Sequence, residues 1–192
     1  MARPREFDTI QVLEQATHLF LVKGYAATSL RHLIAAMDIS KSSFYEAFDS
    51  KQDLYLLVLD RYIDKIVDQL VSTLGQGASP RTAIAVSFND IIDGAMAGDD
   101  CLGCLLTNAA AEVCADDAAA GRIAHGLARQ EEAYYEAIVR AQRSGEVPPG
   151  HDARALARFL TTSANGLQLM AKATSDRMAL YDVARVVLSC LD

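Results

Sequence analysis

The polar side chains around Phe44 are the first group in the sequence whose types and spacing suggest a chemistry. Phe44 and Phe48 are four residues apart, so on a helix they would point inward together and leave the polar side chains outside. The side chains left outside are those of Lys41, Ser42, Ser43, Tyr45 and Glu46. A short helix with such donors and acceptors on its exposed face can read base edges in the major groove of DNA. We therefore expect these five residues to form a base-reading face.

The residues before this segment predict a second short helix and a tight turn. An apolar stripe at helical spacing consists of Leu30, Leu33, Ile34 and Met37. Asp38 interrupts the stripe at the position where the turn requires a left-handed backbone conformation, and Ser40 can cap the helix that follows. Two short helices joined in this way form a helix-turn-helix. Thr28 begins the first helix and Lys51 follows the second, so we expect both side chains to contact DNA phosphates.

Residues 29–55, SLRHLIAAMDISKSSFYEAFDSKQDLY, resemble the DNA-binding signature of the TetR family of bacterial regulators. The resemblance extends back to Ile10. It departs from the family pattern at Asp38, where glycine is common, and at Ala47, where a histidine or an aromatic residue is frequent. The resemblance implies a two-fold dimer that binds a palindromic operator in double-stranded DNA as a repressor. It also implies a helical body that holds a ligand cavity.

The cysteines are the second group that suggests a chemistry, and Cys104 stands at an expected helix start. Backbone amides and the helix dipole at such a start favour an anion, so they would favour the thiolate of Cys104. The segment from Gly103 onward, GCLLTNAAAEVCADD, resembles the corresponding segment in the branch of the TetR family that responds to electrophiles and oxidants. Lys172, in LQLMAKAT, lies in a segment with the same resemblance, and an ammonium beside Cys104 would also favour the thiolate. The opposing interpretation is a buried, inert Cys104 and a solvated Lys172.

Cys101 and Cys104 also form a C-x-x-C pair, which raises an alternative from another class of protein. A thioredoxin-like redox pair follows a strand, and no alternating β-branched run precedes this pair. A zinc site needs four ligands, and no second pair is nearby. In a reducing cytoplasm Cys114 and Cys190 are most simply free thiols. A thiol-redox or metal-binding protein that uses Cys101 and Cys104 remains the alternative.

Length and composition predict an all-α protein. The chain has 192 residues, of which 51% are hydrophobic, and its apolar residues recur at the spacing of about nine helices. We expect a three-helix DNA-binding domain at residues 1–50 and a helical regulatory and dimerisation domain at residues 51–192. The first helix should bury Ile10, and the long helix that begins at Lys51 should bury Leu57.

The body should hold both a dimer face and a ligand cavity. We expect the last two helices to pair with their copies in a homodimer, through a face that includes Leu167 and Val187; the alternative is that these are ordinary core faces of a monomer. The inward candidates for the cavity are Tyr62, Phe88, Asn108, Tyr134, Phe159 and Gln168. A small-molecule or electrophile effector that alters the body is expected to release the DNA.

Charge and the motifs that are missing limit the other functions. Residues 1–51 carry six basic and six acidic side chains, while the whole chain has a net charge of −7. A segment without net charge does not by itself predict nucleic-acid binding, so the prediction requires some of the basic side chains of residues 1–51 to lie on one surface. These are Arg3, Arg5, Lys41 and Lys51. The sequence has no nucleophile triad, carboxylate pair, phosphate loop or metal motif, so we expect no enzyme activity and no cofactor. No apolar run of about 18 residues and no secretory signal occur, which predicts a cytoplasmic protein without a membrane partner.

Overall fold

A computed structural model describes residues 8–96, 102–112 and 117–192 of the protein, and these residues form nine α-helices and no strand. The prediction of an all-α fold is confirmed. The helices are α1 (Thr9–Ala27), α2 (Leu30–Met37), α3 (Lys41–Ala47), α4 (Lys51–Gly75), α5 (Pro80–Ala95), α6 (Leu105–Glu112), α7 (Asp117–Arg143), α8 (Ala153–Ala173) and α9 (Arg177–Leu188), and a 3-10 turn, η1 (Ser189–Leu191), follows α9. Among the described helices, none has the length and apolar character needed to span a bilayer.

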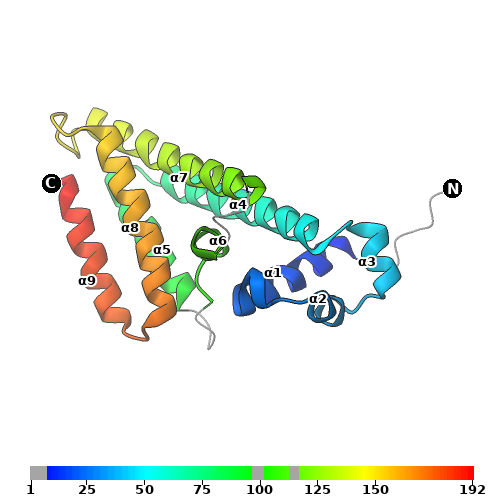
Figure 1. The fold of residues 1–192 in the computed structure, drawn as a ribbon. Helices are drawn as coiled ribbons and strands as arrows, with labels where there is room; N and C mark the ends of the chain where they lie inside the picture. Colours follow the sequence, from blue (N-terminus) through cyan, green and yellow to red (C-terminus); the bar gives the residue numbers. More distant parts are fainter. Residues whose placement is uncertain (1–7, 97–101, 113–116) are drawn as a thin grey trace.

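Helices α1, α2 and α3 pack against the start of α4 and form the head of the molecule (Figure 1). Side chains at the centre of the head that are completely buried are Phe20, Leu33, Phe44 and Leu54. The ring of Phe20 meets the ring of Tyr55 edge-on, with the centroids 4.9 Å apart. Fully burying one side chain of this size contributes about 1.5–3 kcal/mol. This cluster therefore fixes α3 against the other helices of the head.

The link between α2 and α3 is the tight turn that the sequence predicts. Asp38 has φ 51° and ψ 45°, in the left-handed region that aspartate tolerates better than most residues. Ser29 accepts a hydrogen bond from the amide of His32, and Ser40 accepts one from the amide of Ser43. Both helices begin at serine N-caps, which stabilise a helix start by about 1 kcal/mol. The helix-turn-helix prediction is confirmed.

The body consists of α4 to α9, and α4 and α7 run side by side along it (Figure 1). Gly126 on α7 permits the close approach, because a Cβ there would lie 3.0 Å from Cγ2 of Ile63 on α4. A second buried cluster joins α5, α7, α8 and α9 around Phe88, Tyr134 and Leu160. Since α4 contributes to the core of the head and to the body, this single helix connects the two parts.

Two apolar residues that the sequence predicts in the core are exposed. The buried residues of α1 are Val12, Leu13, Ala16 and Phe20. Ile10 lies beside that face and is 54% exposed. Leu57 is 44% exposed, because α4 buries the other side of its helix, around Leu54 and Val58. α1 continues to Ala27, with a kink at Gly24.

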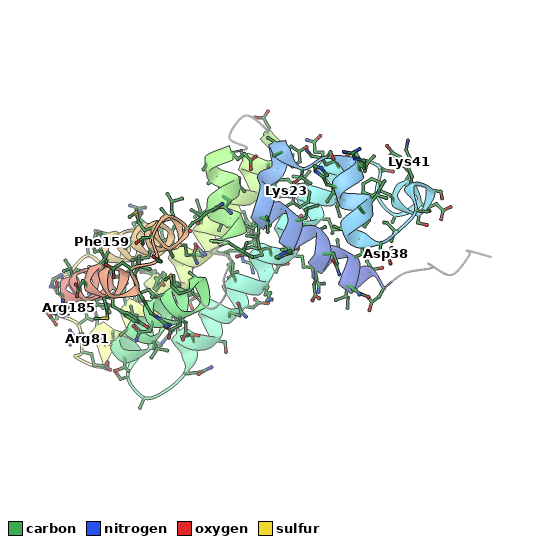
Figure 2. The ribbon with its side chains drawn as sticks, turned by 90° about the horizontal axis from the view of Figure 1, so that it is seen from below. Lys23, Asp38, Lys41, Arg81, Phe159 and Arg185 are labelled. Carbon is green, nitrogen blue, oxygen red and sulfur yellow. The ribbon has the colours of Figure 1, made fainter. Side chains whose placement is uncertain are left out.

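The last two helices each bury one face and expose another. Leu167 and Val187 are only 3% and 6% exposed and belong to the core of the protomer, so they cannot form a surface between copies. The exposed apolar side chains of these helices are Phe159, Leu169, Met170, Met178, Val183 and Val186. We call this set the α8–α9 apolar face. Figure 2 shows Phe159 at the end of the molecule far from Lys41 and the head.

Candidate functional site

Helix α3 presents a polar face to solvent at the end of the molecule away from α8 and α9, where Figure 2 shows Lys41. Its exposed polar residues are Lys41, Ser42, Tyr45 and Glu46. The ring of Tyr45 meets the buried ring of Phe44 edge-on at 5.4 Å, so the core orients Tyr45 while half of it stays exposed. Ser43 is only partly exposed, and its hydroxyl lies 2.8 Å from that of Ser40. The hydroxyl of Ser42 lies at the same distance from that of Ser40, so both serines contact the cap residue of α3.

Thr28 lies inside the head and not on its surface. The residue is 1% exposed, and its hydroxyl donates to the carbonyl of Gly24 at 2.6 Å. Its amide donates to the carbonyl of Tyr25 at 3.2 Å. The predicted phosphate contact of the Thr28 side chain is wrong, because its one hydroxyl proton is already used to close the kink after α1.

Lys51 is also engaged inside the head. Its ammonium donates to the carbonyls of Tyr25 at 2.7 Å and Thr28 at 2.6 Å, and it lies 4.1 Å from the centroid of the Tyr25 ring. Burial lowers the pKa of Lys51, and the nearby carboxylate of Glu112 opposes that shift. Two of the three N–H groups of the Lys51 ammonium thus hold the end of α1, and its phosphate contact stays a prediction.

Arg31 is a basic residue of the head that the sequence analysis did not single out. It is exposed on α2, on the side opposite the buried Leu33 and Met37. The first helix of a helix-turn-helix crosses the DNA backbone, so an exposed guanidinium there is suited to a phosphate contact. Helical periodicity is the signal that could have identified it. Arg3 and Arg5 lie outside the residues that the structure describes.

A cavity of about 590 Å³ lies in the body, and its walls come from α4, α5, α7, α8 and the residues just before α6. Tyr62, Tyr134 and Gln168, which the sequence predicts as lining residues, all line it. Cys104 forms part of the wall as well. The volume is in the range of small-molecule sites. The structure therefore brings the candidate pocket and the candidate thiol together.

Three other predicted pocket residues lie elsewhere. Phe88 is fully buried in the core, with its ring centroid 6.1 Å from that of Tyr134. The amide of Asn108 is turned toward the segment before α6 and donates to the carbonyl of Leu102 at 3.3 Å. Phe159 is 46% exposed on α8. Their predicted lining roles are wrong, because helical spacing separates inside from outside but does not separate cavity wall from core or from an intermolecular face.

The cavity is lined by hydrogen-bonding groups with little charge. Asp90 is the one charged side chain among the described lining residues, and it accepts a hydrogen bond from Thr73 at 3.2 Å. Burial raises the pKa of Tyr134 to about 12, so its phenol stays neutral. Asn165 donates to Gln130 Oε1 at 3.0 Å. The lining therefore favours a neutral or cationic occupant.

Cys104 is held at the start of α6 and is 2% exposed. Its carbonyl accepts the amide of Asn108 at 2.9 Å, which makes it the first residue of the helical hydrogen-bond pattern. The hydroxyl of Tyr62 on α4 lies beside the thiol of Cys104 and the backbone of Leu105. Burial raises the pKa of Tyr62 above its usual value, and the neighbouring Cys104 adds to this shift. Tyr62 thus joins α4 to the first turn of α6.

Lys172 lies close to this helix start, on α8. Its Cδ is 3.4 Å from the position that a Cβ of Gly103 would occupy, and the residue itself is exposed. The stem of Lys172 therefore packs beside the residue that precedes Cys104. Cys101 and Cys114 lie outside the described residues, and no group of three possible metal ligands occurs within the described part of the chain. Cys190 is half-buried near the end of the chain, where burial raises the pKa of its thiol.

Two family models match the sequence. The model described as bacterial regulatory proteins, tetR family, matches residues 12–58, which include α2 and α3. The model described as tetracyclin repressor-like, C-terminal domain, matches residues 85–187. The two matches thus cover the helix-turn-helix and most of the body.

Curated relatives and solved structures agree with these models. The uncharacterized HTH-type transcriptional regulator YezE of Bacillus subtilis is 32% identical over the full length of both chains. The HTH-type transcriptional repressor ComR of Escherichia coli is 31% identical over 97% of this chain and 90% of its own. A cysteine-substituted form of the TetR family transcriptional regulator CifR, solved with a 26bp double-strand operator DNA, is 27% identical with a TM-score of 0.87, over 99% of this chain and 100% of the CifR chain. The protein therefore belongs to the tetR family of bacterial regulatory proteins, which are transcriptional regulators and not enzymes.

Proposed function

We propose that this protein is a homodimeric repressor that binds a palindromic operator through α3 and leaves it when the body is altered by an effector. The observation that carries the proposal is the exposed polar face of α3. A helix-turn-helix with a left-handed Asp38 and N-caps at Ser29 and Ser40 holds this face in place. Two relatives support it: ComR is named a repressor, and CifR was solved with operator DNA. Residues 1–50 serve as the DNA-binding domain and residues 51–192 as the regulatory domain.

Within the head, the exposed side chains of α3 and α2 have different tasks. Lys41, Ser42, Tyr45 and Glu46 offer donors, acceptors and an aromatic edge to the bases, while the amide of Ser43 donates to the cap residue Ser40. Arg31 joins Lys51 as a phosphate contact and takes the place of Thr28, because the Arg31 side chain is exposed and the Thr28 hydroxyl is used inside the head.

The dimer forms through the α8–α9 apolar face. Scattered exposed apolar residues are common on proteins, but here six of them occur on two adjacent helices at one end of the molecule. Phe159 and Met170 are eleven residues apart on α8 and share one side of it. Association of two such faces buries apolar side chains that the protomer leaves in water, and it places two copies of α3 on one DNA molecule.

The effector acts at the cavity wall, by modification of the Cys104 thiol. An electrophilic carbon would form a bond to the sulfur while the thiol proton moves to the adduct; hydrogen peroxide would transfer one oxygen to the sulfur, giving a sulfenic acid and releasing water. Either product adds bulk beside Tyr62, where α6 meets α4. The resemblance to electrophile-responsive regulators and the place of Cys104 in the wall support this role. Lys172, whose stem packs beside Gly103, is the positively charged residue that we assign to this site.

A non-covalent effector is the second candidate, and the cavity itself favours it. The space of about 590 Å³ is lined by amides, hydroxyls and apolar side chains around a single carboxylate, Asp90. The amide nitrogen of Gln130 would donate to a carbonyl or hydroxyl of the ligand. An organic anion would meet Asp90 with no cationic side chain among the described lining residues to offset the repulsion, so the ligand is neutral or positively charged.

Selection of bound sequences from a random DNA pool, with and without oxidant, tests the proposal. The untreated protein should enrich a palindrome, and the treated protein should not. Cys104→Ser should keep its operator after oxidation, whereas the control Cys190→Ser should lose it as the wild type does. If no palindrome is enriched, the operator proposal fails. If Cys104→Ser is released as readily as the wild type, the effector binds without modifying this thiol.

A further inference from the structure

The end of α6 is hydrogen-bonded to the end of α1, across the boundary between body and head. Glu112, the last residue of α6, accepts the amide of Tyr25 on Oε2 at 2.9 Å and the amide of Ala26 on Oε1 at 2.7 Å. Both carboxylate oxygens are thus used on consecutive amides of another helix. Hydrogen bonds to an ionised acceptor are about twice as strong as neutral ones.

The backbone of α1 is shaped to receive this carboxylate. Gly24 has φ 76° and ψ 169°, a conformation that interrupts α1 and that residues other than glycine rarely adopt. A Cβ on Gly24 would lie 2.8 Å from Oε2 of Glu112, too close for a real contact. Glycine therefore permits both the kink and the approach of Glu112.

The same segment is held from the other side by the head. Lys51 donates to the carbonyls of Tyr25 and Thr28, and the hydroxyl of Thr28 donates to the carbonyl of Gly24. Three carbonyls of residues 24–28 are thus bound within the head, while two amides of the same segment are bound by the body. This segment leads directly into α2, which begins at Leu30.

The other end of α6 lies at the cavity. The helix has eight residues and is about 12 Å long, from Cys104 in the cavity wall to Glu112 at the head. Leu105, Leu106 and Ala109 are buried in the same apolar cluster as the core of the head. Because the sides of this short helix are packed, it moves as a unit, so a shift at one end displaces the other end.

We infer that Glu112 is a positioning residue: it fixes the segment before α2 to the end of α6, so that a displacement of α6 at Cys104 moves α2 and α3. The inference rests on the proposed function in one respect, that a change at the cavity wall displaces α6. The contact itself, and its effect on the orientation of α2, do not depend on which effector is used.

Operator affinity and amide exchange test the contact in the unmodified protein. Glu112→Ala should speed hydrogen exchange at Tyr25 and Ala26 and weaken operator binding about tenfold, since each protomer then lacks two charge-assisted bonds. Glu112→Gln keeps one acceptor and should give a smaller effect. Glu136→Ala, which removes an exposed carboxylate of α7 that is remote from this contact, is the matched control and should change neither readout.

The coupling is measured by the ratio of operator affinities before and after treatment with N-ethylmaleimide. In the wild type this ratio should be large; in Glu112→Ala it should fall toward one, although mass spectrometry finds Cys104 modified to the same extent. If the operator affinity of the wild type does not change after N-ethylmaleimide treatment, the thiol mechanism is refuted. Hydrogen exchange and operator affinity of untreated Glu112→Ala still test the role of Glu112. Unchanged exchange at residues 25 and 26 in Glu112→Ala overturns the inference. A uniform rise of exchange over all helices also overturns it, because this would indicate a loss of overall stability only.

Discussion

Thr28 and Lys51 have side chains of the type that binds phosphate, and both are engaged inside the head. The Thr28 hydroxyl and two of the three N–H groups of Lys51 are bound to the carbonyls of Gly24, Tyr25 and Thr28. The sequence identifies residue types correctly, but a hydroxyl or an ammonium can serve a backbone carbonyl as well as a phosphate. Which partner it has depends on the kink at Gly24, and no periodic pattern in the sequence reports that kink.

Substitution of Tyr45 or Lys41 by Ala should abolish specific operator binding. Each base or phosphate contact contributes about 1–3 kcal/mol, and a symmetric dimer loses it twice. Because both side chains are exposed, the melting temperature should stay within a degree or two of wild type. Fluorescence anisotropy with labelled operator measures the loss, and Lys65→Ala, an exposed lysine on α4, is the control. Wild-type affinity in both variants would contradict the assignment of α3.

Arg31→Ala should weaken binding to operator and to unrelated DNA by similar factors. A phosphate contact carries no sequence information, so its removal lowers affinity uniformly and reduces the slope of log affinity against log salt by about one for each phosphate that is no longer neutralised. Thr28→Val is the contrasting variant. It leaves the carbonyl of Gly24 without its donor and should lower the free energy of unfolding by about 1–3 kcal/mol. A change in sequence preference in Arg31→Ala would instead indicate a base contact.

At the scale of the element, the sequence predicts where α6 starts, but it does not predict the contact that the other end of α6 makes. The glycine and cysteine before an apolar run predict the helix start, and Cys104 accepts the first helical hydrogen bond. Glu112 gave no signal, because its partners are backbone amides of residues 25 and 26, which every sequence has. Contacts of this kind between distant segments follow from the packing of the chain and are not encoded in a motif.

Gly24→Ala should destabilise the protein and disturb the contact with α6 together. At φ 76° and ψ 169°, a region that only glycine commonly adopts, a non-glycine residue costs on the order of 1–3 kcal/mol, and the added methyl displaces the carboxylate of Glu112. Gly77→Ala also places a side chain at a positive φ but meets no atom within 4 Å, so it should leave the contact between Glu112 and α1 unchanged. Urea unfolding measures the loss of stability, and hydrogen exchange at Tyr25 and Ala26 measures the contact. Wild-type exchange at these two amides in Gly24→Ala would mean that the methyl does not displace Glu112.

At the scale of the whole molecule, much of the fold could be predicted from the sequence and much of the body could not. Helical spacing and caps predict about nine helices and the helix-turn-helix, because those signals are local. They do not predict which apolar face meets which partner. Leu167 and Phe159 lie on the same helix; one is in the protomer core, and the other is 46% exposed. Only the packing of α8 on α7 and α5 separates them.

Val186→Asp should convert the dimer into a folded monomer that binds operator weakly. Val186 is 69% exposed in the protomer, so a carboxylate there is solvated in the monomer and is buried without a partner only when two α8–α9 apolar faces meet. One copy then has a single α3 for a two-fold operator, and it can occupy only one half-site. Sedimentation velocity measures the assembly, and Val71→Asp, at an exposed valine on α4, is the matched control that should remain a dimer. Leu167→Asp should instead unfold the protomer, because that side chain is 3% exposed. A Val186→Asp protein that sediments as a dimer and keeps wild-type operator affinity would show that the copies meet through another surface.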